Sequence, residues 1–300
     1  MTPTATITNQ PELTFAQRDK IIGGAVSDVS HIATLPEITV KIIELVENPN
    51  STAQDLHLII SNDPALSARV LKVVNSAFYA LPGQVGSINR AIVLLGLNAV
   101  KNIAIAASLA KLFRGGRLCP TFSARDLWQH SISVAAATKL LAERTGLAAP
   151  EEAFLSGLMH DIGIMVEMQV RRPKLLQVFD RMTTQNETFR QAELNVFLVT
   201  HEHFGQALCE RWKFPAFLSQ VAGYHHRPAE VGGEHRPLVM MSHVADVMAA
   251  RSGLGYAGTV DRPEYRQPVQ DELKLTAPML DEVLALLPAA AEVADNLLNS

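Results

Sequence analysis

The sequence predicts an all-α protein, and three observations support this fold class. From Phe15 onward, apolar residues recur at spacings of three and four, as they do along one face of a helix. Strict alternation of apolar and polar residues over the length of a strand is hard to find. Hydrophobic residues make up 48% of the 300 residues, which is enough to bury a substantial core.

Helix-start signals and periodicity define the first half of the chain. Asp63 followed by Pro64 combines an N-cap with a proline at the first helical position. Ser51 with Gln54 matches a capping box for the preceding helix. Asn75 suits a helix end, where its side chain can bind backbone groups of the following loop. The pattern predicts helices over 38–47, 52–61, 64–78, 88–95 and 98–113.

A break in the pattern separates this half from the next. The segment GGRLCPT, within 113–123, predicts a seam between two helical lobes. Beyond it, Thr188 with Gln191 matches another capping box, and the basic run at 171–174 predicts a solvated loop. The pattern predicts further helices over 123–145, 151–168, 174–183, 188–198, 201–212, 215–226 and 236–250.

A second break, over 252–270, is rich in glycine and proline and predicts a tether to one more helix over 278–298. The apolar face of that helix comprises Leu280, Val283, Leu284, Leu287 and Val293. We therefore expect an N-terminal lobe at about 14–115, a second lobe at about 121–250 and a C-terminal helix within 271–300.

Charge and cysteine content exclude several functional classes. The formal net charge is -4, so no overall positive field attracts nucleic acid, and none is expected as a partner. Cys119 and Cys209 lie far apart without a CxxC partner, which provides neither a disulfide framework nor a thiolate zinc site. Residues 1–15 lack the pattern of a signal peptide, and Lys111 interrupts the most apolar stretch. We expect a cytoplasmic protein without membrane contact.

Histidine and aspartate residues form the candidate functional site. The centre is Gly157-Leu158-Met159-His160-Asp161-Ile162-Gly163. Adjacent residues on a helix project about 100° apart, so His160 and Asp161 can approach one metal, or a pair, only beside other helices that supply ligands. Further candidate ligands occur on four predicted helices: His130, His201, His225, His226 and Asp246.

Asp126 lies one helical turn before His130 and could ligate a further ion or orient that imidazole. Imidazole and carboxylate ligands without thiolates suit one or two divalent ions of iron or manganese, with zinc as a further option. A single histidine is more often a surface or core-edge residue than a ligand. We keep that interpretation for five others: His31, His57, His203, His235 and His243.

Taken in order, the motifs resemble the HDOD family over about 31–230. The N-terminal half of the resemblance consists of Leu35-Pro36, Asp63-Pro64-Ala65-Leu66-Ser67, Val70-Leu71, Asn75-Ser76, Ile88-Asn89-Arg90-Ala91-Ile92 and Leu95-Gly96-Leu97. The second half consists of Leu127-Trp128-Gln129-His130-Ser131, the GLMHDIG segment, His201 with Gly205, Trp212 with Pro215, and His225-His226. This series is far more specific than a His-Asp pair alone.

The resemblance implies a multi-helix HDOD fold, with an N-terminal helical lobe and an HD-like C-terminal lobe related to the HD and HD-GYP metal phosphohydrolases. It also implies an output role in bacterial signalling. Seven residues occupy positions that resemble the metal ligands of HD-GYP enzymes: His130, His160, Asp161, His201, His225, His226 and Asp246. Asp126 resembles the additional carboxylate of those enzymes.

Two departures from HD-GYP enzymes limit the inferred activity. Ile164 stands where those enzymes have a lysine, a cation that can stabilise charge on a transferring phosphate. The GYP signature is also absent, because Arg227-Pro228-Ala229-Glu230-Val231-Gly232-Gly233 follows His226. A cyclic dinucleotide is therefore a poor candidate substrate.

Two functions remain. The first is a metal-binding regulatory module that acts through a signalling protein partner or a small nucleotide-like ligand. The second is a metal-dependent phosphohydrolase or phosphodiesterase, in which Asp161 would belong to the catalytic centre.

Overall fold

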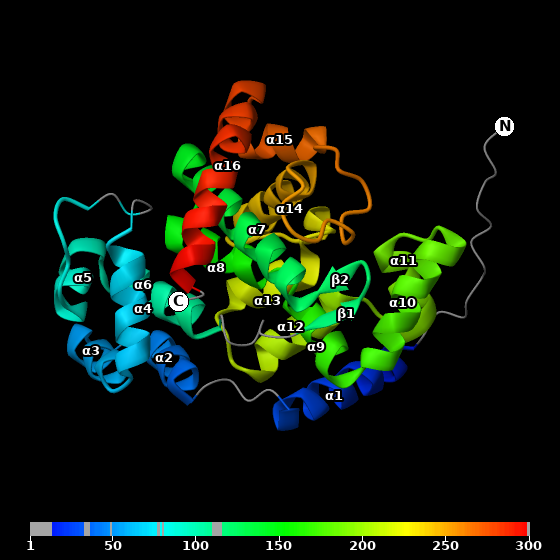
Figure 1. Cartoon of the computed structure of the whole chain (residues 1–300), viewed down its shortest axis with the longest axis horizontal. Coiled ribbons are helices and arrows are strands. Elements are labelled where there is room, and N and C mark those ends of the chain that lie inside the picture. The colour runs from blue at the N-terminus through cyan, green and yellow to red at the C-terminus, as the bar shows by residue number, and fades with distance from the viewer. Residues whose placement is uncertain are drawn as a thin grey trace.

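The computed structural model describes residues 14–32, 37–48, 50–76, 79, 81–109 and 116–298. Helices dominate this part of the chain, so the predicted all-α fold class is confirmed. Figure 1 shows α2–α6 gathered at one end of the molecule, with the remaining helices around the long central helix α7. No helix in the described ranges combines the length and apolar character needed to cross a membrane.

The N-terminal lobe consists of five helices: α2 (Glu37–Glu47), α3 (Ala53–Ser61), α4 (Pro64–Val74), α5 (Ile88–Leu95) and α6 (Leu97–Leu109). The other four pack against α6, which is therefore buried around most of its circumference. Asp63 caps α4 as predicted, and Pro64 occupies its first turn. Residues 77–78 and 110–113 of the predicted helices lie outside the described residues.

Polar side chains at two helix ends in this lobe bind backbone groups, one as predicted and one not. Asn75 bonds both backbone groups of Val85, which confirms its predicted role. The capping box of α3 is formed by Thr52 and Asp55, so the predicted pair of Ser51 and Gln54 is wrong by one residue. The hydroxyl of Ser51 instead accepts a hydrogen bond from Lys101.

The C-terminal lobe consists of eight α-helices: α7 (Ala124–Thr145), α8 (Pro150–Met159), α9 (Ile162–Val170), α10 (Arg172–Gln185), α11 (Phe189–Phe197), α12 (His201–Arg211), α13 (Ala216–Tyr224) and α14 (Arg236–Arg251). A short 3-10 helix, η2 (Pro228–Glu230), connects α13 to α14. Helix α7 packs against α8 and α14, and α12 packs against α9 and α13. The predicted capping box of Thr188 and Gln191 is confirmed at α11.

Two predictions in this lobe are wrong. The helix predicted over 151–168 is divided at His160-Asp161 into α8 and α9. The basic run at 171–174 is not a loop but contains the start of α10, because Pro173 suits the first turn of a helix. Two of its three charges have partners: Arg171 lies 3.0 Å from Asp28, and Lys174 donates to the carbonyl of Val196.

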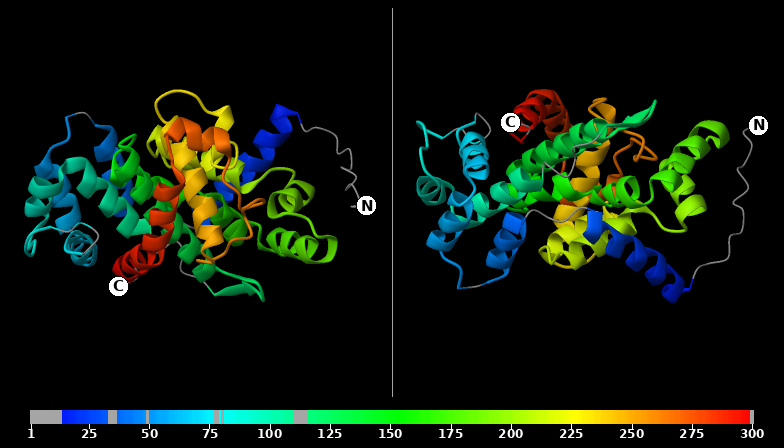
Figure 2. Two further views of the ribbon diagram at one scale, coloured as in Figure 1. Left: turned by 90° about the horizontal axis from the view of Figure 1, so that it is seen from above. Right: turned by 60° about the horizontal axis from the view of Figure 1, so that its bottom comes forward.

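Two α-helices and a two-stranded hairpin were not predicted. Helix α1 (Phe15–Ile32), assigned by sequence to the N-terminal lobe, packs against α9 and α12 (Figure 2). Strands β1 (Arg117–Cys119) and β2 (Phe122–Ser123) form a short antiparallel hairpin within the predicted seam. Helix α15 (Gln267–Leu273) lies at the end of the predicted tether.

The final helix, α16 (Ala277–Leu298), links the two ends of the molecule. It packs against α7 and also against α4 of the N-terminal lobe (Figure 1). Leu280, Val283 and Leu287 are buried, which confirms the predicted apolar face. Near its end, the indole Nε1 of Trp128 donates to Asp295 over 2.6 Å. The lobes are thus joined by packing as well as by the chain.

Candidate metal centre

Seven of the eight candidate ligands meet in the buried interior of the C-terminal lobe. They come from α7, α12 and α14, from the junction of α8 with α9, and from the residues that follow α13: His130, His160, Asp161, His201, His225, His226 and Asp246. They form two groups, Asp161 with His201, His225 and His226, and His130 with His160 and Asp246. Within each group, one potential ligand atom per residue lies within 4.8 Å of the others, so either group could hold a metal ion.

Asp161 faces both groups with its two carboxylate oxygens. Oδ1 lies 3.3 Å from Nε2 of His201 and 3.3 Å from Nε2 of His225. Oδ2 lies 3.3 Å from Nε2 of His160 and 3.8 Å from Nε2 of His130. A carboxylate in this position can bridge two neighbouring ions.

Asp246 lies on the other side of the second group. Its Oδ1 is 3.0 Å from Nε2 of His130 and 3.9 Å from Nε2 of His160. Its Oδ2 is 3.8 Å from Nδ1 of His226. The two carboxylates therefore lie among five imidazoles, an oxygen and nitrogen donor set that suits iron, manganese or zinc.

The break between α8 and α9 places His160 and Asp161. His160 follows the last residue of α8, and Asp161, with φ -99° and ψ 17°, precedes the first residue of α9. A Cβ on Gly163 would overlap the carbonyl oxygen of His201, so α9 and α12 touch backbone to backbone there. The directions of the His160 and Asp161 side chains are thus set by the interruption between α8 and α9 and by the close contact of α9 with α12. They are not set by the 100° spacing of one continuous helix.

Hydrogen bonds orient three of the imidazoles. The Nδ1 atoms of His160 and His225 lie 2.7 Å and 3.1 Å from the carbonyl oxygens of Gly157 and Val221. Nδ1 of His201 lies 2.8 Å from Oε1 of Glu193. A carbonyl can only accept, so Nδ1 carries the proton in His160 and His225, and in their neutral form Nε2 presents its lone pair to the site.

Many polar atoms of the site have no hydrogen-bond partner among the described residues. They include both oxygens of Asp161, Oδ1 of Asp246 and Nε2 of five imidazoles: His130, His160, His201, His225 and His226. Unpaired buried polar atoms are costly and rare in native proteins. Their concentration at one point, with lone pairs directed inward, fits the binding of metal ions.

The electrostatics of the site also favour cations. Burial alone would lower the pKa of His160, but Asp161 and Asp246 outweigh it and raise that pKa to about 9. Burial alone would raise the pKa of Asp161, but the surrounding imidazoles, His160 first, hold it well below its usual range. The carboxylates are therefore ionised at neutral pH and attract positive charge.

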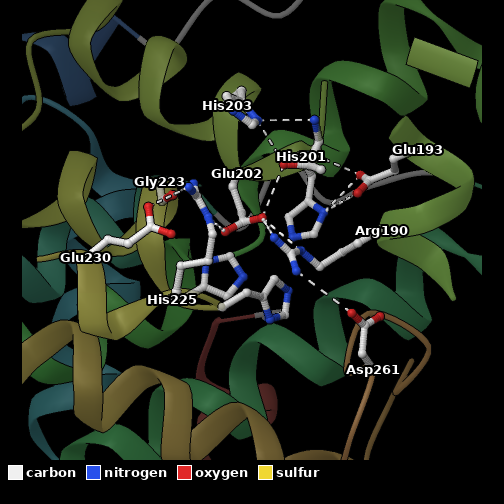
Figure 3. Close-up of polar contacts among 12 residues, drawn as sticks. Arg190, Glu193, His201, Glu202, His203, Gly223, His225, Glu230 and Asp261 are labelled. Carbon is white, nitrogen blue, oxygen red and sulfur yellow. Dashed lines mark hydrogen bonds and ion pairs between the residues drawn. The ribbon is translucent and has the colours of Figure 1, made fainter. Parts of the chain in front are cut away.

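Two buried acidic residues that the sequence analysis did not identify, Glu193 and Glu167, lie next to the imidazole ligands. Glu193 accepts hydrogen bonds from the backbone N–H of His201 at 2.9 Å and from its ring (Figure 3). Burial raises the pKa of Glu193 and of neighbouring Glu167 well above the ordinary value. The nearby carboxylate of Glu193 raises the pKa of Glu167 further. The only sequence signal for Glu193 is an acidic residue in a helix that ends shortly before His201.

Glu202 organises a second network beside the site (Figure 3). Its buried carboxylate lies 2.7 Å from Arg190 and 3.1 Å from Arg227. Burial would raise the pKa of Glu202, but His225, His201 and the two arginines together lower it to about 2. Arg190 also lies 3.8 Å from Asp261, so its charge is already shared between two carboxylates.

Asp126, the eighth candidate, belongs to neither group. Its carboxylate accepts the hydroxyl of Ser123 at 2.6 Å, and its backbone N–H donates to the same hydroxyl. Both bonds turn the side chain toward the start of α7. The carboxylate one turn before His130 therefore binds the hydroxyl of Ser123, the residue that caps α7.

The histidines interpreted as ordinary residues are also absent from both groups. His57 lies 3.3 Å from Ser61 on α3, His203 caps α12 through Thr200, and His235 is partly exposed beside Glu234. Nδ1 of His243 donates to the carbonyl of His225 at 2.8 Å. The side chain of His31 lies outside the described ones.

A cavity of about 360 Å³ reaches the metal-type residues from the surface. His226 and Asp246 form part of its wall, together with His243, Arg190 and the segment 260–266. Ile164, at the position of the HD-GYP lysine, is fully buried. A small ligand could enter through this cavity and meet the centre at His226 and Asp246.

Comparisons with known proteins agree with the fold. The HDOD domain model matches residues 32–228. An HDOD domain protein of Geobacter sulfurreducens has a similar structure, with a TM-score of 0.78, 26% identity, and coverage of 95% of this chain and 99% of that chain. A proposed signal transduction protein of Marinobacter aquaeolei has a TM-score of 0.74 and 23% identity, with coverage of 97% of this chain and 67% of that chain.

A curated relative from Treponema pallidum is 24% identical over 224 residues, which is 74% of this chain. The chain spans only 43% of the length of that relative.

Proposed function

Because the chain belongs to the HDOD family, we propose that it is a signalling output module whose C-terminal lobe holds one or two divalent transition-metal ions. The position of Asp161 carries this proposal. Each of its oxygens faces a different pair of imidazoles at 3.3 to 3.8 Å, and neither oxygen has a hydrogen-bond partner among the described residues. A bridging role for this carboxylate favours two ions over one.

The donor set supports iron or manganese, with zinc as the third candidate. Five imidazoles and two carboxylates offer nitrogen and oxygen, and both cysteines lie outside the groups. Such mixed sites suit first-row transition metals and are unlike the all-oxygen cages of calcium. The centre would hold its ions through His130, His160 and Asp246 on one side and His201, His225 and His226 on the other.

The experiment that tests the centre is metal analysis of the full chain after aerobic and anaerobic purification with added iron and manganese. We expect at least one ion per chain, and loss of most of it in the double variant His160→Ala with Asp161→Ala. Metal-free protein from the anaerobic preparation would overturn the proposal. Folding of the variant is checked by circular dichroism, because ligand removal also lowers stability.

We assign partner binding to the N-terminal lobe. This lobe contributes no member of either metal group, and it exposes apolar side chains on two adjacent helices, Leu58 on α3 (51% exposed) and Val93 on α5 (74% exposed). Val93→Asn should abolish the cellular output while metal content stays at the wild-type level. If the cellular output were unchanged in Leu58→Asn, in Val93→Asn and in the double variant, the partner would not bind to this part of the N-terminal lobe.

The cavity at His226 and Asp246 favours a second function, a metal-dependent phosphohydrolase. Two bound ions would polarise a phosphate and activate a water molecule. Among the protein groups, Asp161 and Asp246 would hold the centre, and His226 would face the substrate. A His160→Ala protein that is folded and abundant but without output, alongside N-terminal lobe variants with normal output, would favour catalysis over regulation.

Efficient hydrolysis of cyclic dinucleotides is not expected. The fully buried Ile164 supplies no cation, and the segment after His226 forms the 3-10 helix η2. Rapid turnover of such a substrate would contradict this expectation.

A further inference from the structure

Two arginines at the mouth of the cavity have no assigned role. Arg262 and Arg266 line the cavity, are exposed, and form no ion pair with any residue in the described ranges. Arg190 differs from them, because Glu202 and Asp261 already offset its charge. The mouth therefore presents two guanidinium groups whose charge is not neutralised by a direct partner.

Two residues of the metal centre line the same cavity. They are His226 and Asp246, so a molecule bound there can contact both the arginines and the centre. His243 adds a buried Nε2 without a hydrogen-bond partner among the described residues, and its Nδ1 donates to the carbonyl of His225. In the neutral ring this Nε2 can only accept a hydrogen bond.

Charge balance selects the ligand class. The seven metal-type residues bring two negative charges, from Asp161 and Asp246, so two divalent ions would leave the centre with an excess of positive charge. Arg262 and Arg266 add to this field, and Glu264 at the same mouth opposes it in part. A compact anion that can contact both a metal and a planar guanidinium fits this arrangement, and a phosphate group has the necessary oxygens.

We propose that this cavity is a phosphate-binding subsite, in which Arg262 and Arg266 hold one face of a phosphate group whose other face meets the metal centre. The phosphate group would be either free phosphate or the terminal group of a small phosphomonoester. Both arginines lie beyond residues 32–228, the part matched by the HDOD domain model, so this subsite is a property of the segment that follows the family domain. The subsite rests on the proposed function only through the bound ions.

The test is isothermal titration of manganese-loaded full-length chain with inorganic phosphate, and in a second arm with adenosine monophosphate. Loss of a charge-assisted hydrogen bond from each arginine predicts that the double variant Arg262→Gln with Arg266→Gln binds phosphate at least about 10-fold more weakly. Tighter binding of the monoester than of phosphate would identify an organic phosphate as the ligand, and the reverse order would identify free phosphate.

Two control variants sharpen the test. Arg211→Gln removes the same charge from an exposed site outside the cavity lining, and should leave the affinity within about 2-fold of wild type because exposed charges are screened by salt. Glu264→Gln removes the opposing charge at the mouth and should tighten binding. Arg190 is left unchanged, since its loss would leave the buried Glu202 without its closest cation.

Metal content, measured on each sample, separates the two hypotheses. Wild-type protein that holds no metal refutes the proposed function. Metal-loaded wild type that binds neither anion, or a fully metal-loaded double variant with wild-type affinity for phosphate, refutes the subsite and leaves the metal centre standing.

Discussion

At the scale of single residues, Asp161 and Asp126 form a matched pair for substitution. Asp161→Asn replaces a carboxylate that faces four imidazoles, whereas Asp126→Asn changes one that accepts a hydrogen bond from Ser123, the N-cap of α7. We expect Asp161→Asn to lower metal affinity by more than the roughly 10–100-fold typical of residues that merely support a ligand. Asp126→Asn should keep wild-type metal content, measured by inductively coupled plasma mass spectrometry.

Equal metal loss in both variants would place Asp126 in the centre. A small fall in the melting temperature of Asp126→Asn is expected in any case, because an acidic residue in the first turn stabilises a helix by about 0.3–1 kcal/mol.

Glu193 acts on the centre through His201, so its effect depends on keeping an acceptor. Glu193→Leu removes the acceptor for Nδ1 of His201 and should lower metal affinity by about 10–100-fold. Glu193→Gln keeps a carbonyl oxygen at the same distance from the backbone and should retain most of the affinity. Competition with a chromogenic chelator measures both variants, and equal affinities for Leu and Gln would contradict an orienting role.

The candidate ligands could be predicted from residue type and order, but their supporting residues could not. Seven of the eight side chains meet as expected, since the motifs that carry them follow one another in a specific series. Asp126 was chosen for its position one turn before His130, and that spacing cannot reveal the competing bond to Ser123. Glu193 contacts His201 through a turn whose geometry is set by the tertiary fold.

At the scale of elements, the contact of α9 with α12 depends on Gly163. A side chain there would overlap the carbonyl of His201, the first residue of α12. We expect Gly163→Ala to lower the free energy of unfolding by about 1–3 kcal/mol or more, as for other overpacked sites, and to reduce metal content. Chemical denaturation and metal analysis provide the two measurements.

Gly205→Ala is the graded control for this contact. Its Cβ would lie 3.2 Å from the Cβ of Ala222 and 3.3 Å from the backbone nitrogen of Gly163, contacts that are tight but far less severe than the overlap at Gly163. We expect a smaller loss of stability than for Gly163→Ala. A larger loss of stability for Gly205→Ala than for Gly163→Ala would show that α9 and α12 can move apart without a cost in free energy.

Helices with strong periodicity were predictable, and interruptions decided by tertiary contacts were not. The predictions for α3, α5, α11 and α14 have the correct type and nearly the correct bounds, because their end signals and apolar faces are local properties. Helix α4 begins at Pro64 as predicted but ends at Val74, well before the predicted end at residue 78. The division of α8 from α9 leaves no gap in the periodicity, since Met159, Ile162 and Met165 are all buried apolar residues. The short helix α15 follows a stretch rich in proline and glycine, which conceals it.

At the scale of the whole molecule, the centre joins six helices of one lobe (α7, α8, α9, α12, α13 and α14), and metal removal should therefore loosen all of them together. An ion that binds only the folded state, at a free concentration 1,000 times its dissociation constant, stabilises that state by about 4 kcal/mol. We expect a chelator to lower the melting temperature of the wild-type protein by several degrees in differential scanning calorimetry. The Asp161→Asn variant should already melt near the lower temperature and respond little to the chelator.

If the chelator lowered the melting temperatures of wild type and Asp161→Asn equally, its effect would come from another part of the protein. The N-terminal lobe provides an internal reference, because none of its described side chains belongs to a metal group.

The packing of α16 across both lobes has a consequence for synthesis. Helix α7 lies in the middle of the chain, yet one of its faces is covered by residues 277–298, which the ribosome adds after every other described element. The same late segment reaches α4, which is made much earlier. A nascent chain therefore exposes apolar surface on α7 until residues 277–298 have been synthesised, and this interval is when chaperones would be needed most.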